Sequence, residues 1–400
     1  MKPPTPEVPA DAAAIDSAWL TRALRSSGVL TDGGVTDVQV EPLGGSQGFA
    51  GQLRRVRVNY DHERQGALGS AEDELGVDSR FRGNDGTNVA RSLPPSFIVK
   101  LHSPIAITRG LIRRIGAASR EIRFYRELAP RAGVPTAALH FAAQDGDRYV
   151  LLLEDLAPAQ AGDPAAGCLP EQVQATVARV AGMHAAWWDS PALASLDWIP
   201  VFEELTATRH AICREAWPEF VERYRRHFPD LCHRVGPALI DGLNTVRHAL
   251  SQAPPTLLHG DFRPDNVMYA AGGAGPPVAF VDWQVMLRGP GPMDVAYFLL
   301  SAADRGTRRA LETDVLRDYR AALTHGGVTG YTAEQCHTDY RLAMADVLSR
   351  IVVLTTRVLP EGAAGWSVFD VLAERIAGAV VDLECLALIA SLSDRSRPLA

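Results

Sequence analysis

One short pattern constrains the fold of this chain more than any other: HGDFRPDN at residues 259–266, followed by VDW at residues 281–283. Apolar runs too short for helices stand beside both motifs, and they predict strands near residues 257–258, 267–269 and 278–282. The two motifs therefore predict a polar loop held between short strands, with Asp261, Asn266 and Asp282 beside the strand ends.

These three polar residues form a set of oxygen donors suited to phosphate chemistry. Asp261 would accept the proton of an attacking hydroxyl, while Asn266, five residues later, and Asp282 would hold Mg²⁺ on the phosphates of ATP. Phosphoryl transfer needs little covalent chemistry from the protein, so one positioned base and a few oxygen ligands for Mg²⁺ are nearly the whole requirement. The spacing therefore indicates an enzyme that moves the γ-phosphoryl group of ATP.

Composition narrows the class of protein. A chain of 400 residues is long enough for two domains, and 46% hydrophobic with 22% charged residues is typical of a globular protein. The net charge of −7 argues against a nucleic-acid binder, whose affinity would need a basic surface. The five cysteines are scattered without a CxxC pair, so we expect neither a disulfide framework nor a zinc site.

Two segments bear on targeting. The N-terminus, MKPPTPEVPADAA, lacks the apolar core of a signal peptide. The apolar stretch Ile376–Leu392 contains Asp382 and Glu384, so we expect one buried helix there and no membrane span. These features predict a cytoplasmic protein.

The first part of the chain predicts a helix followed by strands. Residues 16–27 have helical spacing, with Trp19, Leu20 and Leu24 on one face and a cap at Asp16 or Ser17. Residues 35–60 predict two strands joined by a glycine-rich turn. Residues 61–95 are polar and break every period, so we interpret them as a mobile insertion, an acquired passenger without a functional role.

Further along, Phe97–Leu101 predicts a short strand that contains Lys100, and residues 117–128 predict a helix that contains Glu121. Residues 139–143 and 149–153 predict a hairpin, and the β-rich region ends at residues 154–158. Helical patterns dominate beyond it, beginning with a stripe of Val173, Val177, Val180, His184 and Trp188.

The order of these features resembles the aminoglycoside phosphotransferase family, a branch of the protein-kinase-like fold that also includes choline-kinase-like and ecdysteroid-kinase-like enzymes. The resemblance covers about residues 35–305 without the insertion, and it is carried by HGDxxxxN, VDW and the strand lysine with its helix glutamate. It implies an α+β, two-lobed fold. A small antiparallel lobe would span residues 1–155, and a mostly helical lobe with the acceptor site would span residues 156–400.

The resemblance also implies a nucleotide site. Lys100 would meet the α- and β-phosphates of ATP and would be held by Glu121, with Glu127 as a weaker rival for that role. Without Cβ atoms in the way, backbone N–H groups of the glycine-rich turn would approach phosphate oxygens. The residues of this turn are Gly44, Gly45, Ser46 and Gly48. Backbone groups between Leu153 and Leu156, including Glu154, would meet the adenine.

Four further residues surround the motif. Arg263 either stabilises the transferring phosphoryl group or forms a surface ion pair, and the sequence favours neither. His259 is expected to brace the loop, and Asp294 to cap a helix and hold the loop in place. His184 lies on an apolar stripe and is expected to be a core histidine.

The function expected is in-line transfer of the γ-phosphoryl group to a hydroxyl of a small molecule, with Asp261 as base, ATP as donor and Mg²⁺ as cofactor. The alternative is a catalytically silent nucleotide-binding module that acts through partners. A protein kinase is disfavoured because Trp283 and Gln284 replace the usual Phe-Gly and because residues 288–292 are too short for an activation segment. The sequence leaves the acceptor open, although no dense acidic run favours a cationic one.

Overall fold

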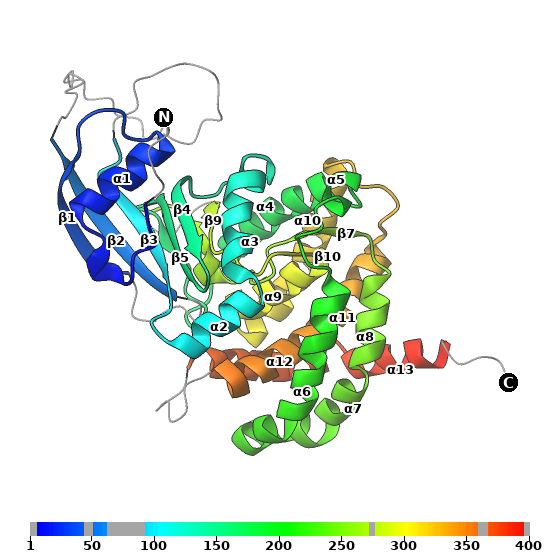
Figure 1. Ribbon diagram of the computed structural model, residues 1–400. Coiled ribbons are helices and arrows are strands. Elements are labelled where there is room, and N and C mark those ends of the chain that lie inside the picture. Colours follow the sequence, from blue (N-terminus) through cyan, green and yellow to red (C-terminus); the bar gives the residue numbers. More distant parts are fainter. Residues whose placement is uncertain (1–5, 44–50, 62–92, 272–276, 359–366, 396–400) are drawn as a thin grey trace. The chain divides into compact units, whose positions relative to one another are not determined.

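The computed structural model describes residues 6–43, 51–61, 93–271, 277–358 and 367–395. By its internal contacts the chain divides into two compact units (Figure 1). The first comprises residues 1–114 and 138–155, and the second comprises residues 115–137 and 156–400. The sequence pattern assigned residues 115–137 to the first domain, whereas their contacts group them with the second unit.

The first unit is built on an antiparallel sheet with the strand order β1-β2-β3-β5-β4. Its strands are β1 Val35–Pro42, β2 Gly51–Tyr60, β3 Ser96–His102, β4 Leu139–Asp145 and β5 Arg148–Glu154. Successive residues of a strand point to opposite faces. Phe97, Val99 and Leu101 of β3 enter the core cluster on one face, so Lys100 points to the other. The predicted strands and hairpin are confirmed.

Helix α1 (Ser17–Ser27) packs on the core face of this sheet (Figure 1). Its start is fixed by Asp16, whose carboxylate accepts the N–H of Trp19 at 2.7 Å, as a helix cap does. The Trp19 ring then packs edge-on against Phe141, with 5.7 Å between centroids. A second helix, α2 (Ala106–Arg114), was not predicted; it is short, and Ile112 is its only buried residue.

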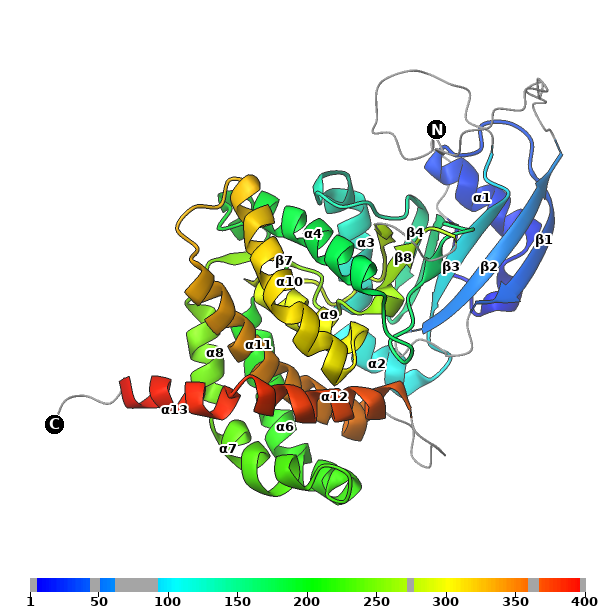
Figure 2. The ribbon, with the colours of Figure 1, turned by 180° about the vertical axis from the view of Figure 1, so that it is seen from behind.

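The second unit is mostly helical (Figure 2). Its helices are α3 Ala117–Arg123, continued by a π-helical turn Phe124–Leu128, then α4 Pro170–Trp187, α5 Pro191–Ala194, α6 Phe202–Tyr224, α7 Gly236–Asp241, α8 Leu243–Ser251, α9 Pro292–Ala302, α10 Arg305–His325, α11 Ala333–Val353, α12 Val368–Asp382 and α13 Cys385–Arg395. The prediction of an α+β chain, with an antiparallel sheet followed by helices, is confirmed.

Short strands interrupt these helices. β7 (Pro255–Leu258) pairs with β10 (Leu287–Pro290), and β8 (Val267–Tyr269) lies between β6 (Gln160–Ala161) and β9 (Pro277–Phe280). β7, β8 and β9 were predicted. β10 was not, because Gly289 and Pro290 argue against a strand; the proline is tolerated at the strand's last residue.

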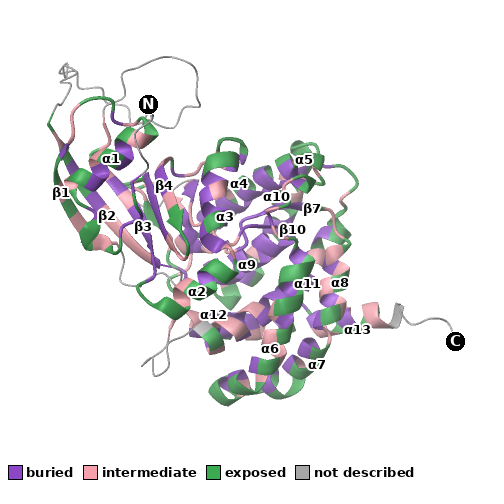
Figure 3. Cartoon of the chain, in the orientation of Figure 1, coloured by how far each residue is buried: buried purple, intermediate pink, exposed green. Residues whose placement is uncertain are grey.

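Helix α9 is the centre of the second unit. Every residue from Pro292 to Ala302 is buried, which is typical of a helix that is apolar on all sides (Figure 3). It packs against α11 and α12, and its first turn lies against the predicted catalytic loop through Asp294. The loop is therefore anchored to the most buried helix of the unit.

The apolar C-terminal stretch differs from its prediction. Residues 376–392 were expected to form one buried helix, but α12 ends at Asp382 and α13 begins at Cys385, with Glu384 at φ +48° between them. A left-handed backbone at a non-glycine residue breaks the helix there. Among the described helices, none alone has the length and apolar composition to cross a membrane, and α12 with α13 meets that criterion only as a pair bent by 56°.

Candidate active site

The predicted loop, residues 259–266, connects β7 to β8 and turns sharply at its second residue. Gly260 has φ +82°, and a Cβ there would lie 2.3 Å from the carbonyl oxygen of Val285. Both the left-handed backbone and the close approach exclude a side chain. The glycine of the HGD motif is therefore required by the path of the loop itself.

Asp294 holds the start of the loop. Its carboxylate accepts the backbone N–H of His259 at 2.7 Å and that of Gly260 at 3.0 Å. His184 lies behind it, with Nε2 3.5 Å from Asp294 and Nδ1 2.9 Å from the hydroxyl of Tyr319. Asp294 is 2% exposed and His184 is fully buried. The structure thus places both residues in the buried support of the loop. Asp294 holds the loop as expected, but the expectation that it caps a helix is wrong, because it lies inside the first turn of α9 and its carboxylate accepts from the loop instead.

His259 links the two halves of the site through its ring. Nε2 donates to the carbonyl oxygen of Val281 at 2.9 Å, and Nδ1 accepts the N–H of Asp261 at 3.3 Å. The ring is fully buried and lies 4.6 Å from the ring of Trp283. His259 therefore ties the segment that carries Asp261 to the segment that carries Asp282, which is the bracing role expected for it.

Asp261 and Asn266 are held together inside the loop. The Nδ2 group of Asn266 donates to the backbone carbonyl of Asp261 at 2.8 Å and lies 3.4 Å from its carboxylate. The turn Pro264–Asn266 brings the two residues to this separation. Because the amide nitrogen faces Asp261, the amide oxygen of Asn266 is turned away from it.

The electrostatic surroundings of Asp261 keep it ionised. Burial raises the pKa of its carboxyl, but the guanidinium groups of Arg263 and Arg350 outweigh that effect, so the pKa lies below its usual range. Arg263 Nε is 3.5 Å and Arg350 Nη1 is 3.7 Å from Asp261 Oδ1. The Arg263 side chain is 14% exposed and also pairs with Asp265 at 3.0 Å, so its ion pairs are largely buried.

Asp282 follows β9 instead of lying on it, two residues after the strand ends at Phe280. Its backbone has φ +64°, a left-handed conformation that is rare outside glycine and that recurs at functional sites. Nε2 of Gln284 lies 3.4 Å from its carboxylate. Asp282 and Asn266 carry oxygen donors of the types that Mg²⁺ prefers.

Trp283 fixes the backbone beside Asp282. Its fully buried ring stacks on Phe124, with 4.0 Å between centroids and 13° between planes, and its Nε1 donates to the carbonyl of Phe280 at 3.1 Å. One turn before Phe124, Arg120 donates to the carbonyl of Gln284 at 3.0 Å. The helix that carries Glu121 is therefore attached to the segment that carries Asp282, and Glu121 itself is 1% exposed. Its rival Glu127 forms an exposed pair with Arg123.

The other residues predicted for nucleotide binding belong mainly to the first unit. Lys100 is 6% exposed in the middle of β3. Glu154 ends β5, and its carboxylate accepts the N–H of Ala138 at 3.0 Å; Leu156 follows in a turn at the start of the second unit. Gly44, Gly45, Ser46 and Gly48, with most of the predicted insertion, lie outside the described residues.

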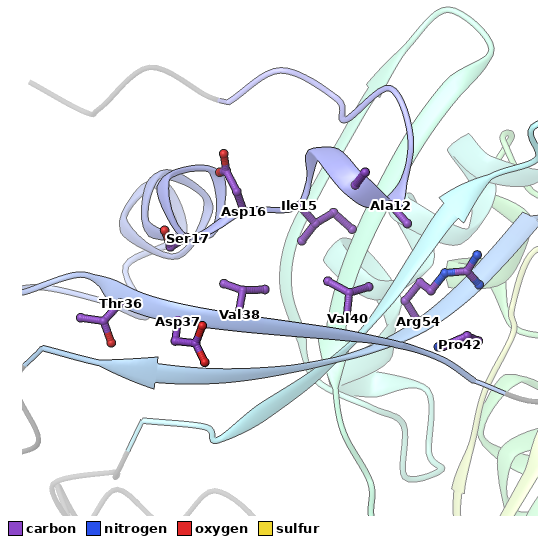
Figure 4. Close-up of a pocket in the computed structure, with 11 residues that line it drawn as sticks. Ala12, Ile15, Asp16, Ser17, Thr36, Asp37, Val38, Val40, Pro42 and Arg54 are labelled. Atoms are coloured by element: carbon purple, nitrogen blue, oxygen red, sulfur yellow. The ribbon is translucent and has the colours of Figure 1, made fainter.

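A hollow of about 630 Å³ lies between the segment before α1 and strand β1 (Figure 4). It includes none of the predicted site residues. Two of its charged groups serve local structure: Asp16 caps α1, and Arg54 donates to Gln52 and to the carbonyl of Leu53. The chemistry-bearing residues therefore lie elsewhere.

Two neighbours of Asp261 were not found from the sequence. Arg350 comes from α11 and Tyr297 from α9, and the Arg350 guanidinium lies 4.7 Å from the Tyr297 ring centroid. No motif marks either residue, because they reach the loop only through the packing of helices that are far apart in the chain.

The phosphotransferase enzyme family matches residues 80–332, more than half of the chain. The chain belongs to this family. The resemblance inferred from HGDxxxxN and VDW is thereby confirmed, and the family supports a small-molecule phosphotransferase. No curated protein matches the chain in sequence.

Solved structures agree with the fold of this phosphotransferase. An ethanolamine kinase of Plasmodium vivax shares 11% identity at a TM-score of 0.50, over 89% of this chain and 83% of that one. A choline kinase of Cryptosporidium parvum Iowa II shares 8% sequence identity at a TM-score of 0.47, over 90% of each chain. Aminoglycoside 2′-phosphotransferase-IIIa, in its GDP complex, shares 13% sequence identity at a TM-score of 0.44, over 91% of this chain and 94% of that one. At such identities the likeness concerns the fold alone, and the ethanolamine kinase supports the predicted kinase-like fold.

Proposed function

We propose that this phosphotransferase moves the γ-phosphoryl group of ATP to a hydroxyl of a small molecule by direct in-line transfer. One observation carries the proposal: a single loop, anchored by Asp294, fixes an ionised Asp261 against Asn266 through the 2.8 Å hydrogen bond from Nδ2. The distance between a base and an oxygen ligand for a metal is then fixed, and phosphoryl transfer depends mainly on such positioning.

The reaction assigns a role to each group near the loop. The acceptor oxygen attacks the γ-phosphorus, the bond from phosphorus to the β,γ-bridging oxygen breaks, the hydroxyl proton goes to Asp261, and ADP leaves. Because nearby arginines keep the pKa of Asp261 low, its main contributions are to orient the hydroxyl and to accept the proton late. Arg263, largely buried beside Asp261, would offset negative charge that develops on the phosphoryl group.

Asn266 and Asp282 would hold magnesium. Their oxygens are the ligand types that Mg²⁺ prefers, and the left-handed backbone of Asp282 gives its carboxylate a direction fixed by the turn. When bound, the metal would supply positive charge that offsets the negative charge of the phosphates. Phosphates and water would provide its other ligands.

The nucleotide would be held by the residues that the sequence predicts for this role. We propose that Lys100 meets the α- and β-phosphates and that Glu121 holds this lysine, since both charged side chains are buried where a partner is required. The glycine-rich turn of Gly44, Gly45, Ser46 and Gly48 would cover the phosphates. Backbone groups near Glu154 and Leu156 would meet the adenine.

The test is Mg-dependent ADP release from ATP across a panel of hydroxylated compounds, with Asp261→Ala as the critical variant. We expect Asp261→Ala to bind Mg-ATP nearly normally and to lose about 10²–10⁴-fold in turnover, the usual contribution of a positioned base. Asp304→Ala is the matched control, because it removes an exposed carboxylate that only caps α10. Full turnover in Asp261→Ala would refute the mechanism. Nucleotide binding without any stimulated, Asp261-dependent release would favour the catalytically silent alternative.

A further inference from the structure

Three arginines gather around the loop that carries Asp261. Arg263 lies within the loop, Arg350 reaches it from α11, and Arg209 approaches from α6 on the same side of α11 as Arg350. Arg209 and Arg350 line a water-sized cavity of about 10 Å³ together with Gly260, Asp294 and Tyr297. Three guanidinium groups therefore lie near the predicted base.

Arg209 and Arg263 are already engaged by carboxylates. Arg209 pairs with the buried Asp346, which also contacts His210 Nε2 at 2.7 Å. Arg263 pairs with Asp265 at 3.0 Å. Neither guanidinium therefore presents an uncompensated charge.

Arg350 differs from both in its carboxylate contact: its nearest carboxylate oxygen is that of Asp261 at 3.7 Å, which is too long for a hydrogen bond. Its Nε, like that of Arg263, is buried without a hydrogen-bond partner among the described residues. The hydroxyl of Tyr297, a residue only 2% exposed, is likewise buried without a partner within the described ranges.

Both groups are donors that face the same charged cluster. The pKa of Tyr297 is raised by burial, so its hydroxyl keeps its proton, and its charged neighbours include Arg263, Asp261 and Arg350. A buried donor without an acceptor costs free energy on the order of 1–3 kcal/mol. Two such donors beside a catalytic base indicate a ligand that brings acceptor oxygens.

Two buried carboxylates near the cluster, Asp346 and Asp370, are not available to a cationic ligand. Asp346 is neutralised by Arg209 and His210. Asp370, at the start of α12, accepts from Arg223 at 2.7 Å and from the hydroxyl of Tyr224. The charge pattern around Asp261 thus opposes a positively charged acceptor and favours a negatively charged one.

We propose that Arg350, assisted by the hydroxyl of Tyr297, binds an anionic group of the acceptor, a carboxylate or a phosphate, on the molecule whose hydroxyl Asp261 deprotonates. This inference rests on the phosphotransferase reaction proposed above and names its substrate class. Because Arg350 Nη1 and Asp261 Oδ1 are 3.7 Å apart, the anion and the reacting hydroxyl are separated by a few bonds. Short hydroxy acids and phosphorylated alcohols meet this description.

The experiment compares matched acceptors in Mg-dependent ADP release by the full chain. The pairs are hydroxybutyrate with its methyl ester, glycerate with glycerol, and glycerol phosphate with glycerol; choline and kanamycin represent cations. We expect stimulation by an anionic member and none by its neutral partner or by the cations. Arg350→Gln is expected to raise the KM of that anionic acceptor by about 30-fold or more, while the KM of ATP changes less than about threefold.

Two variants control the result. Arg357→Gln makes the same substitution in the π-helical turn that follows α11, where Arg357 pairs with the exposed Glu219, and should leave both KM values unchanged. Arg350→Lys keeps the charge and should recover part of the acceptor affinity. Melting curves with and without each compound report binding independently of turnover, and a stabilising shift should appear only with anions and vanish in Arg350→Gln.

The outcomes separate the two proposals. Asp261-dependent turnover of a neutral or cationic compound, with the same KM in Arg350→Gln, would overturn the anionic acceptor and leave the reaction standing. A rise in the KM of ATP alone in Arg350→Gln would assign Arg350 to nucleotide binding and would also overturn the anionic acceptor. No difference within any pair, in turnover or melting, also contradicts it. Release that Asp261→Ala does not reduce would refute the reaction itself.

Discussion

Replacing Asp294 by asparagine tests whether the buried anchor of the loop fixes the site. The carboxylate serves two buried backbone donors, the N–H groups of His259 and Gly260, at 2.7 and 3.0 Å. An asparagine has the same shape but one acceptor oxygen, so its NH₂ group would face one of these donors. The change therefore removes one hydrogen bond and weakens the other without altering the packing.

The structure sets the magnitude. A hydrogen bond to a charged group contributes about 1.5–3 kcal/mol, and the second bond loses roughly 0.5–1 kcal/mol when its acceptor becomes neutral. We expect Asp294→Asn to lower the free energy of unfolding by about 2–4 kcal/mol. Because Asp261 follows the anchored residues directly, a shifted loop should also reduce turnover by roughly 10–10²-fold.

Urea unfolding followed by tryptophan fluorescence measures the free energy of unfolding. Hydrogen exchange of the peptide spanning His259 to Asp261 measures the local opening of the loop. Asp304→Asn is the matched control, since it makes the same change at the exposed cap of α10, where Asp304 accepts the N–H of Thr307 at 3.0 Å. It should cost less than about 1 kcal/mol. If Asp294→Asn unfolds within about 0.5 kcal/mol of the wild type and its loop exchanges no faster, the anchoring argument is wrong.

Two further changes probe the surrounding structure. Trp283→Ala removes a fully buried ring that stacks on Phe124, and it should lower the free energy of unfolding by about 3–5 kcal/mol in urea titrations; a loss below about 1 kcal/mol would contradict the packing. Burial raises the pKa of Asp339 to about 6, despite the 2.7 Å hydrogen bond from Tyr331. Between pH 4 and 6 the folded chain therefore keeps a proton that the unfolded chain, with a carboxyl pKa of 3.8, has released. The ionised Asp339 therefore destabilises the fold above pH 6, and this effect disappears as the pH falls toward 4. Asp339→Asn should raise the urea midpoint near pH 8 but hardly at about pH 4. An equal gain at both pH values would rule out the titration.

Local patterns were enough to place the motif and its strands. The HGD glycine, the apolar runs of β7, β8 and β9, and the alternation along β3 are all properties of neighbouring residues, and neighbours determine backbone turns and strand faces. The same holds for α1, where Asp16 and the spacing of Trp19 define both the cap and the buried face.

Other elements were not predicted, because their sequence signals are weak or point to a different structure. β10 contains glycine and proline and exists only because it pairs with β7. Helix α2 is short, and its apolar residues Ile107 and Leu111 are exposed instead of packed in the core. The break between α12 and α13 depends on a left-handed residue, Glu384, that composition does not reveal.

The sequence by itself determined the family and the candidate site residues: Asp261, Asn266 and Asp282 belong to two motifs whose spacing is encoded locally, and the family match supports a phosphotransferase. Only the tertiary structure decided their surroundings. It placed Arg350 of α11 at 3.7 Å from Asp261, buried Tyr297 beside them, and stacked Phe124 on Trp283. These contacts join residues up to 159 positions apart in sequence through helix packing, which no local period encodes, and they set the charge around Asp261.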